Sequence, residues 1–137
     1  MPDKTFHLEV ITPERSAVAG DVISLQVRAS DGRLGVLHNH APLIASLIPG
    51  RLVCRDGQGK EKVLAVGEGF LEVLKNQVKV LCDFADFPEE IDVKRAQEAR
   101  ERAEKRLKER SKPDIDDGRA EAALRRALVR LRLGGRG

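Results

Sequence analysis

Apolar and polar residues alternate in short runs through residues 6–82. The runs at 6–12 and 22–29 show the clearest alternation, which is the pattern of a half-buried strand. Turn residues, among them Ser30-Asp31-Gly32 and Pro49-Gly50, separate them from further runs at 34–37, 43–47, 51–55, 62–66, 69–74 and 78–82. Short strands at this spacing are typical of antiparallel sheets that form a sandwich or a flattened barrel.

The period changes to that of a helix after Pro88. Asp92 is a good N-cap residue, and Ala96, Ala99, Ala103 and Leu107 then recur three or four positions apart. Residues 111–114 break this helix, and a second one, with apolar residues at 120, 123, 124, 127, 128 and 131, is expected after residues 116–118 and ends at 134–135. The sequence therefore predicts an α+β chain: an N-terminal antiparallel β-sandwich or flattened barrel (1–87) and a C-terminal antiparallel two-helix hairpin (88–137).

The facing stripes of the predicted hairpin consist largely of alanine. Alanine buries little apolar area, and burial stabilises by about 25 cal/mol per Å². The hairpin should therefore dock weakly and extend or pair again at modest cost, as a conformational switch requires.

Composition excludes several classes of protein. The only aromatic residues are four Phe, so a base-stacking RNA platform is not expected. Two Cys and three His are too few for a zinc module or a disulfide framework, and we expect free thiols in a reducing compartment. The sequence has no 18-residue apolar run and no apolar stretch at its N-terminus, so we expect neither a membrane-spanning helix nor a signal peptide.

The net charge of +3 is unevenly distributed. Residues 1–88 carry 10 Lys or Arg and 11 Asp or Glu, whereas residues 89–137 carry 15 and 11. Within 118–137, six Arg face Glu121 alone. This basic end predicts an arm that seeks an acidic partner.

Three groups of residues could carry chemistry, and each has a plainer interpretation. His38-Asn39-His40 could be half of a metal site, but a polar loop in which His40 orients the turn is favoured. Gly67-Glu68-Gly69 could begin a phosphate loop, but no helix follows it, and a tight hairpin turn is favoured. No nucleophile elbow is present, so we do not expect an enzyme. No third ligand is visible in the sequence near His38 and His40, so we do not expect a resident metal.

The third group lies in the hairpin. Asp92, Arg95 and Arg102 share a face of the first helix, and Arg126 and Arg130 share a face of the second. Folded together, they could bind a triphosphate and an adenine amino group. The alternative is a solvated charged face.

Two motifs carry a resemblance to a known family. Residues 32–43, GRLGVLHNHAPL, are similar to the pattern G-x-L-G-(I/V)-x-x-x-H-A-P-(L/F), and residues 67–73, GEGFLEV, are similar to G-G-(F/I)-L-E-V, with Glu68 where Gly is more usual. Together, in this order and followed by a charged helical hairpin, they resemble the ε subunits of bacterial F-type ATP synthases along essentially the whole chain.

The resemblance implies a non-catalytic subunit of the rotor, or central stalk, of a proton-translocating ATP synthase. It implies that the sandwich binds the γ subunit and the c-ring. The hairpin would extend along γ into the α3β3 catalytic head and inhibit ATP hydrolysis. The resemblance also implies a peripheral position on the cytoplasmic face of the bacterial inner membrane, with the membrane contacted only through the complex. We expect the isolated chain to be a monomer.

Some members of this family bind ATP on the folded hairpin through a motif (I/L)-D-x-x-R-A, which Ile91, Asp92, Arg95 and Ala96 match. The resemblance implies ATP as a regulatory ligand, with no cofactor required. The further residues that would bind it are Arg102, Arg126, Arg130 and, where the family often has Glu, Asp86.

The loop facing the c-ring would be Ser30–Gly35, with Asp31, Gly32 and Arg33, and the turn with His38 and His40 is expected close by. Some members have an acidic residue in place of Arg33, so Arg33 could not make their contact with an arginine of the c-ring. The alternative function is a nucleic-acid-binding β-domain whose basic tail contacts phosphates.

Overall fold

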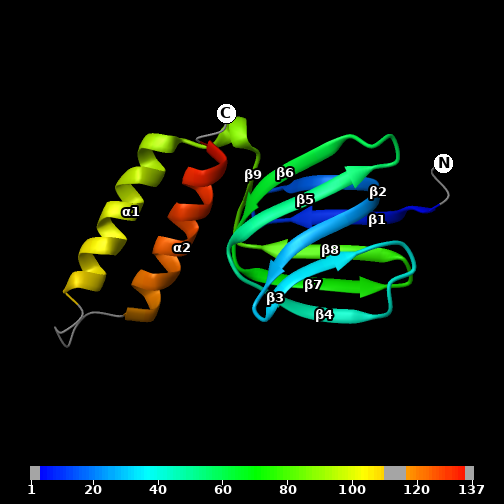
Figure 1. Ribbon diagram of the computed structural model, residues 1–137, viewed down its shortest axis with the longest axis horizontal. Coiled ribbons are helices and arrows are strands. Elements are labelled where there is room, and N and C mark those ends of the chain that lie inside the picture. The colour runs from blue at the N-terminus through cyan, green and yellow to red at the C-terminus, as the bar shows by residue number, and fades with distance from the viewer. Residues whose placement is uncertain (1–3, 110–116, 135–137) are drawn as a thin grey trace. The chain divides into compact units, whose positions relative to one another are not determined.

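The structure is a computed structural model that describes residues 4–109 and 117–134 (Figure 1). It divides into two compact units, Met1–Asp86 and Phe87–Gly137. The first is a β-sandwich and the second a pair of helices, so the predicted fold class is confirmed.

Nine strands make up the described part of the first unit. They are β1 (Phe6–Ile11), β2 (Ser16–Ala29), β3 (Gly32–Val36), β4 (Leu43–Leu47), β5 (Gly50–Asp56), β6 (Glu61–Val66), β7 (Gly69–Leu74), β8 (Gln77–Cys82) and β9 (Ala85–Asp86). Hydrogen bonds join them in the order β1-β8-β7-β4-β2-β5-β6-β9, and β3 adds to β2.

The long strand β2 belongs to both layers of the sandwich (Figure 1). Its first half pairs with β1, and its second half pairs with β3 and β5. One layer is therefore β1, β8, β7 and β4, and the other is β3, β2, β5, β6 and β9. Alternate residues of both layers point inward and are almost fully buried, among them Phe6, Leu8, Leu52, Leu64 and Leu71.

Three details of the sandwich differ from the sequence prediction. The strand predicted at 22–29 begins at Ser16, and β1 and β8 pair in parallel within the otherwise antiparallel arrangement. The segment Gly67–Gly69 is not a hairpin turn, because it leads from β6 in one layer to β7 in the other. Gly69 is required there, since a Cβ would overlap the carbonyl oxygen of Leu81.

A short folded turn opens the second unit. The 3-10 helix η2 (Pro88–Glu90) is capped by Glu90, whose Oε1 accepts a 2.8 Å hydrogen bond from the backbone N–H of Phe87. Helix α1 (Val93–Lys108) begins after Asp92, whose Oδ1 accepts from the N–H of Arg95 at 3.0 Å. The predicted N-cap is confirmed.

Helix α2 (Asp117–Gly134) returns alongside α1 (Figure 1). Ala96 and Ala103 of α1 and Ala120 and Ala127 of α2 are buried, as the alanine stripes predict. The predicted break at Ser111–Asp114 lies outside the described residues. On the exposed side of α1, Arg100 Nε lies 2.8 Å from Glu104 Oε1.

Candidate functional site

An exposed apolar row crosses the outer face of the β1-β8-β7-β4 layer. Phe70 of β7 lies opposite Leu81 of β8, and Leu81 lies opposite Ile11 of β1. Phe70 is 59% exposed and Leu81 49%, and Ile44, diagonal to Phe70 on β4, is 73% exposed. Contiguous apolar side chains on the surface of a folded domain mark an interaction site.

Strand alternation explains why these side chains face outward. The residues of β7 that flank the outward positions, Leu71 and Val73, are buried, so Phe70, Glu72 and Leu74 must point away from the core. The signal is visible in the sequence: β7 reads GFLEVL, with apolar residues at two outward positions where a solvated face would carry polar ones. The row itself depends on the pairing of β7 with β8.

A second candidate site is a basic flank of the hairpin. Gly134 of α2 meets Val93 and Ile91, since a Cβ on Gly134 would stand 2.8 Å and 3.0 Å from their Cγ2 atoms. The rise of about 1.5 Å per residue then sets Arg130 level with Arg95, and Arg126 level with Arg102. Arg95 and Arg102 lie on one side of the alanine stripe of α1, and Arg126 and Arg130 lie on the corresponding side of the stripe of α2. The antiparallel pairing of the helices therefore brings all four arginines to one flank of the hairpin.

The other residues of the predicted nucleotide site take several positions. Asp92 already uses Oδ1 as the helix cap, Ala96 is buried between the helices, and Ile91 packs at the base of the hairpin near Gly134. Asp86 belongs to the sandwich unit, where it pairs with Ala65 across β9 and β6. Within the hairpin unit, the charged residues of the predicted nucleotide site are therefore Asp92 and the four arginines.

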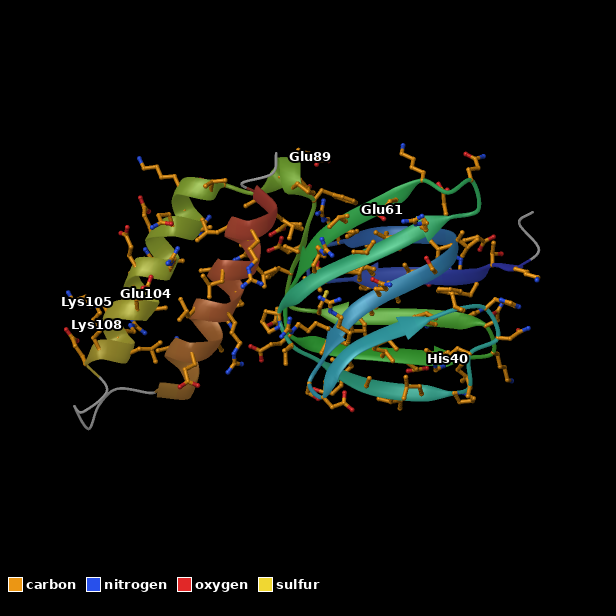
Figure 2. The ribbon with its side chains drawn as sticks, in the orientation of Figure 1. His40, Glu61, Glu89, Glu104, Lys105 and Lys108 are labelled. Carbon is orange, nitrogen blue, oxygen red and sulfur yellow. The ribbon has the colours of Figure 1, made fainter. Side chains whose placement is uncertain are left out.

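The two turns of the predicted c-ring loop lie at opposite ends of β3. Asp31, Gly32 and Arg33 lie at the turn between β2 and β3, beside the end of β4, where the Ser30 N–H donates to the Ser46 carbonyl at 2.9 Å. His38 and His40 follow the opposite end of β3 in the chain, and Figure 2 labels His40. There the Asn39 N–H donates to Asn76 Oδ1 at 2.8 Å, and Asn76 Nδ2 donates to the Thr5 carbonyl. The expectation that the two turns lie close together is therefore wrong.

The side chains with possible chemistry have structural partners. His40 Nδ1 lies 2.8 Å from the Ala41 carbonyl oxygen, as expected for a residue that orients this turn. Within the described residues, no three His, Cys, Asp or Glu side chains are placed to hold a metal. Burial raises the pKa of the Cys82 thiol to about 11 and also raises that of Cys54. Both thiols are free.

Comparison with known proteins identifies the family. Residues 5–88 match the beta-sandwich domain of the ATP synthase Delta/Epsilon chain, and residues 89–135 match its long alpha-helix domain. The chain belongs to this family. It is 47% identical to the ATP synthase epsilon chain of Natranaerobius thermophilus over 133 residues (96% of this chain and 93% of that one). It is 49% identical to that of Moorella thermoacetica over 131 residues, which are 96% and 97% of the two chains.

Solved structures share the fold at low identity. A chain of the Euglena gracilis mitochondrial ATP synthase superposes with a TM-score of 0.74 at 23% identity, over 91% of this chain and 78% of that one. A chain of the Tetrahymena thermophila mitochondrial ATP synthase, from its central stalk and c-ring, superposes with a TM-score of 0.60 at 13% identity, over 95% and 93%.

The family assignment decides between the two functions considered from the sequence. The predicted resemblance to ATP synthase ε subunits is confirmed, and nothing supports the nucleic-acid-binding alternative. Epsilon chains are non-catalytic subunits of ATP synthase. Among the described residues, no helix is long and apolar enough to cross a membrane.

Proposed function

We propose that this chain is the regulatory stalk subunit of a proton-translocating F-type ATP synthase. Its sandwich joins the γ subunit to the c-ring, and its hairpin extends to inhibit ATP hydrolysis by the catalytic head. The observation that carries this proposal is the division of the chain into two compact units at Asp86/Phe87. A firmly packed sandwich can stay bound while a separate hairpin changes its conformation.

The γ subunit docks on the apolar row of Ile44, Phe70 and Leu81. These side chains are exposed in the isolated chain, and burying each of them would stabilise a complex by about 1.5–3 kcal/mol. A strand face is a rigid platform, so the row is suited to the transmission of torque.

The hairpin is the inhibitory arm. Among the described residues of α1 and α2, four of the six buried ones are alanines, so the packing of the hairpin contributes less per residue than that of the sandwich. Separation of the two helices therefore costs little. The arginines of α2 then become available to acidic surfaces of the catalytic head.

ATP favours the folded hairpin. The flank with Arg95, Arg102, Arg126 and Arg130 offers guanidinium groups to phosphate oxygens, and Asp92 keeps one carboxylate oxygen outside the helix cap for an adenine amino group. Nucleotide bound there would hold α1 and α2 together and so oppose extension.

The turn with Asp31, Gly32 and Arg33 faces the c-ring. This turn lies at the tip of the β2–β3 pair. The subunit is then peripheral, on the cytoplasmic face of the bacterial membrane, and contacts the membrane only through the ring.

The test is ATP hydrolysis by an F1 head depleted of its own ε subunit. The full chain should lower the rate, whereas residues 1–88, which hold the complete sandwich core, should bind γ without lowering it. Preincubation with ATP should relieve the inhibition by the full chain. Equal inhibition by both forms would exclude the hairpin as the inhibitory element, and failure of both forms to bind would exclude the stalk role.

A further inference from the structure

Two arginines oppose each other on the outer face of the second layer. Arg28 of β2 and Arg33 of β3 are direct partners in the antiparallel register. Both side chains are exposed, and the neighbours that alternate with them, Val27 and Ala29, are buried. Direct partners on one face of a sheet have Cβ atoms about 5 Å apart, so the two guanidinium groups start from adjacent points.

A third arginine, Arg51 of β5, lies on the same outer face. Gln26 and Val53 are the last partners of β2 and β5, and strand alternation places Arg28 and Arg51, each two residues from them, on the outer face. The Arg28 carbonyl accepts from the Ile48 N–H at 3.2 Å, so Arg51 is not its direct partner. Gly50 leaves room for Arg28, because a Cβ at Gly50 would stand 2.8 Å from the Arg28 Cβ and 3.3 Å from its Cδ.

We call Arg33, Arg28 and Arg51 the arginine row. Arg28 and Arg33 start one strand spacing apart, about 4.8 Å, and Arg51 lies on the same face of β5.

The row lacks carboxylate partners among the described residues. Arg28, Arg33 and Arg51 form no ion pair and no side-chain hydrogen bond there, and the exposed Asp31 at the adjoining turn pairs with none of them. Arg55, on the same face of β5, shows the usual arrangement: its Nη2 lies 2.8 Å from Glu61 Oε2 on the paired strand β6. Arg28 and Arg33 instead face a like charge on the paired strand.

This arrangement is unfavourable for the sandwich alone. Like charges directly opposite each other on a sheet destabilise it, and the packing of Arg28 over a glycine provides no ion pair in return. Sequences that break a local rule without compensation within the fold do so mostly at functional sites. The row therefore points to a partner that supplies the missing negative charge.

We propose that the arginine row binds a protein surface that presents carboxylates. Guanidinium groups bind carboxylates through two parallel N–H···O bonds, and three such groups on one face suit two or three acidic residues. Glu or Asp at positions i and i+4 of a helix lie about 6 Å apart along the axis, which matches the spacing of the strands. Val53 and Val63, half-buried on the same face, add an apolar edge of the kind found in protein interfaces.

The choice of a protein over other anions rests on the proposed stalk function, in which the neighbours of this chain are protein subunits. The row includes Arg33 of the turn assigned to the c-ring. It therefore deepens that assignment: the subunit that meets this turn should carry Asp or Glu there.

The first test uses the isolated full chain and a synthetic hexaglutamate peptide at low salt, followed by amide chemical shifts in the ¹⁵N-labelled protein. The largest shifts should fall at Arg28, Arg33, Arg51 and their strand neighbours. The triple variant R28Q/R33Q/R51Q should bind the peptide about tenfold more weakly or worse. The matched control K60Q/K75Q/K79Q removes the same charge at exposed positions and should bind like the wild type.

Equal weakening in the two triple variants would show that only net charge matters and would overturn the proposal. Vesicles with anionic headgroups are tested in the same way as the peptide. A response of the row to vesicles without a response to the peptide would also overturn it, because the partner would then be a lipid surface.

The second test uses the assembled ATP synthase with the variant R28K, which keeps the charge and adds an amine. A carbodiimide joins an amine to a carboxylate only in direct contact, so residue 28 should become linked to an Asp or Glu of a neighbouring subunit. Assembly without this link overturns the inference and leaves the stalk function intact. Failure to assemble, together with peptide binding at the row, overturns the stalk function and leaves the carboxylate preference standing.

Discussion

Gly134 is the residue at which the end of α2 touches the start of α1. A Cβ there would stand 2.8 Å from Val93 Cγ2 and 3.0 Å from Ile91 Cγ2, and both neighbours are β-branched. We expect Gly134→Val to destabilise the folded hairpin by about 1–3 kcal/mol, the usual range for an overpacked contact. Hydrogen exchange of the α1 and α2 amides measures this.

The control for that experiment is Gly20→Val in β2, where a Cβ meets nothing within 4 Å. It should leave the exchange of the hairpin unchanged. Exchange in the Gly134→Val protein as slow as in the wild type would show that the base of the hairpin adapts without cost.

The two buried thiols make a prediction about pH. Burial raises the pKa of Cys82 from 9.0 to about 11, so at pH 8 the native thiolate fraction is about 100-fold below that of an unfolded chain. We expect alkylation of Cys82 by iodoacetamide at pH 8 to be slowed at least by that factor and to become fast on denaturation. Equal rates in the native and denatured protein would contradict the burial of this thiol.

The raised pKa of Cys82 also sets the direction in which the stability of the folded protein changes with pH. Because the pKa of Cys82 is raised in the folded state, the protonated thiol contributes stability that is fully present below pH 9. The contribution is lost as the pH rises from 9 toward 11. Denaturant unfolding of the wild type and of Cys82→Ala should therefore show a difference in stability that shrinks across this interval.

At the scale of the element, helix α1 depends on its cap. Asp92 Oδ1 accepts from the Arg95 N–H at 3.0 Å, and the buried residues of α1 are Ala96 and Ala103. Loss of the cap costs about 1 kcal/mol, a large share for a helix with so little buried area. We expect Asp92→Ala to speed amide exchange in the first turn of α1 about fivefold.

Asn can cap a helix as Asp does. Asp92→Asn should therefore keep the exchange rate of the wild type while it removes the negative charge. If Asn and Ala gave the same fast exchange, the charge of Asp92 rather than its hydrogen bond would stabilise α1.

The sequence predicted the elements better than their pairing. Alternation located eight of the nine strands, and the alanine stripes located both helices, because one-sided burial leaves a period in the sequence. The first half of β2, SAVAGD, has small residues and no strong alternation, and β9 has two residues, so neither produces a signal. The parallel pairing of β1 with β8 depends on contacts between distant segments, which no local pattern records.

The candidate sites also differ in whether a local sequence pattern records them. The hairpin arginines could be grouped from the sequence because helix periodicity fixes their spacing. The apolar row and the pairing of Arg28 with Arg33 could not, because both join residues of different strands through the sheet register. The separation of the two turns once grouped as one loop, Asp31–Arg33 and His38–His40, also depends on the direction of β3.

At the scale of the whole molecule, the two units differ in how they are held together. The sandwich buries large side chains such as Phe6, Leu8 and Leu52, whereas the helix interface has alanine at its centre. Unfolding or opening should therefore begin in the hairpin, while the sandwich keeps its core. A subunit that must hold one partner and release another benefits from this unequal stability.

The apolar row should decide whether the sandwich binds its rotor partner. Phe70→Ser with Leu81→Ser removes two side chains that are 59% and 49% exposed, so the fold loses little. If the γ subunit covers them, the lost burial of about 3–6 kcal/mol weakens binding by 100-fold or more. Titration calorimetry of purified γ with the full chain measures this. Leu37→Ser, which removes an apolar side chain that is 62% exposed in the loop after β3, is the matched control and should bind like the wild type. Undiminished affinity of the double variant would move the γ interface to another face of the sandwich.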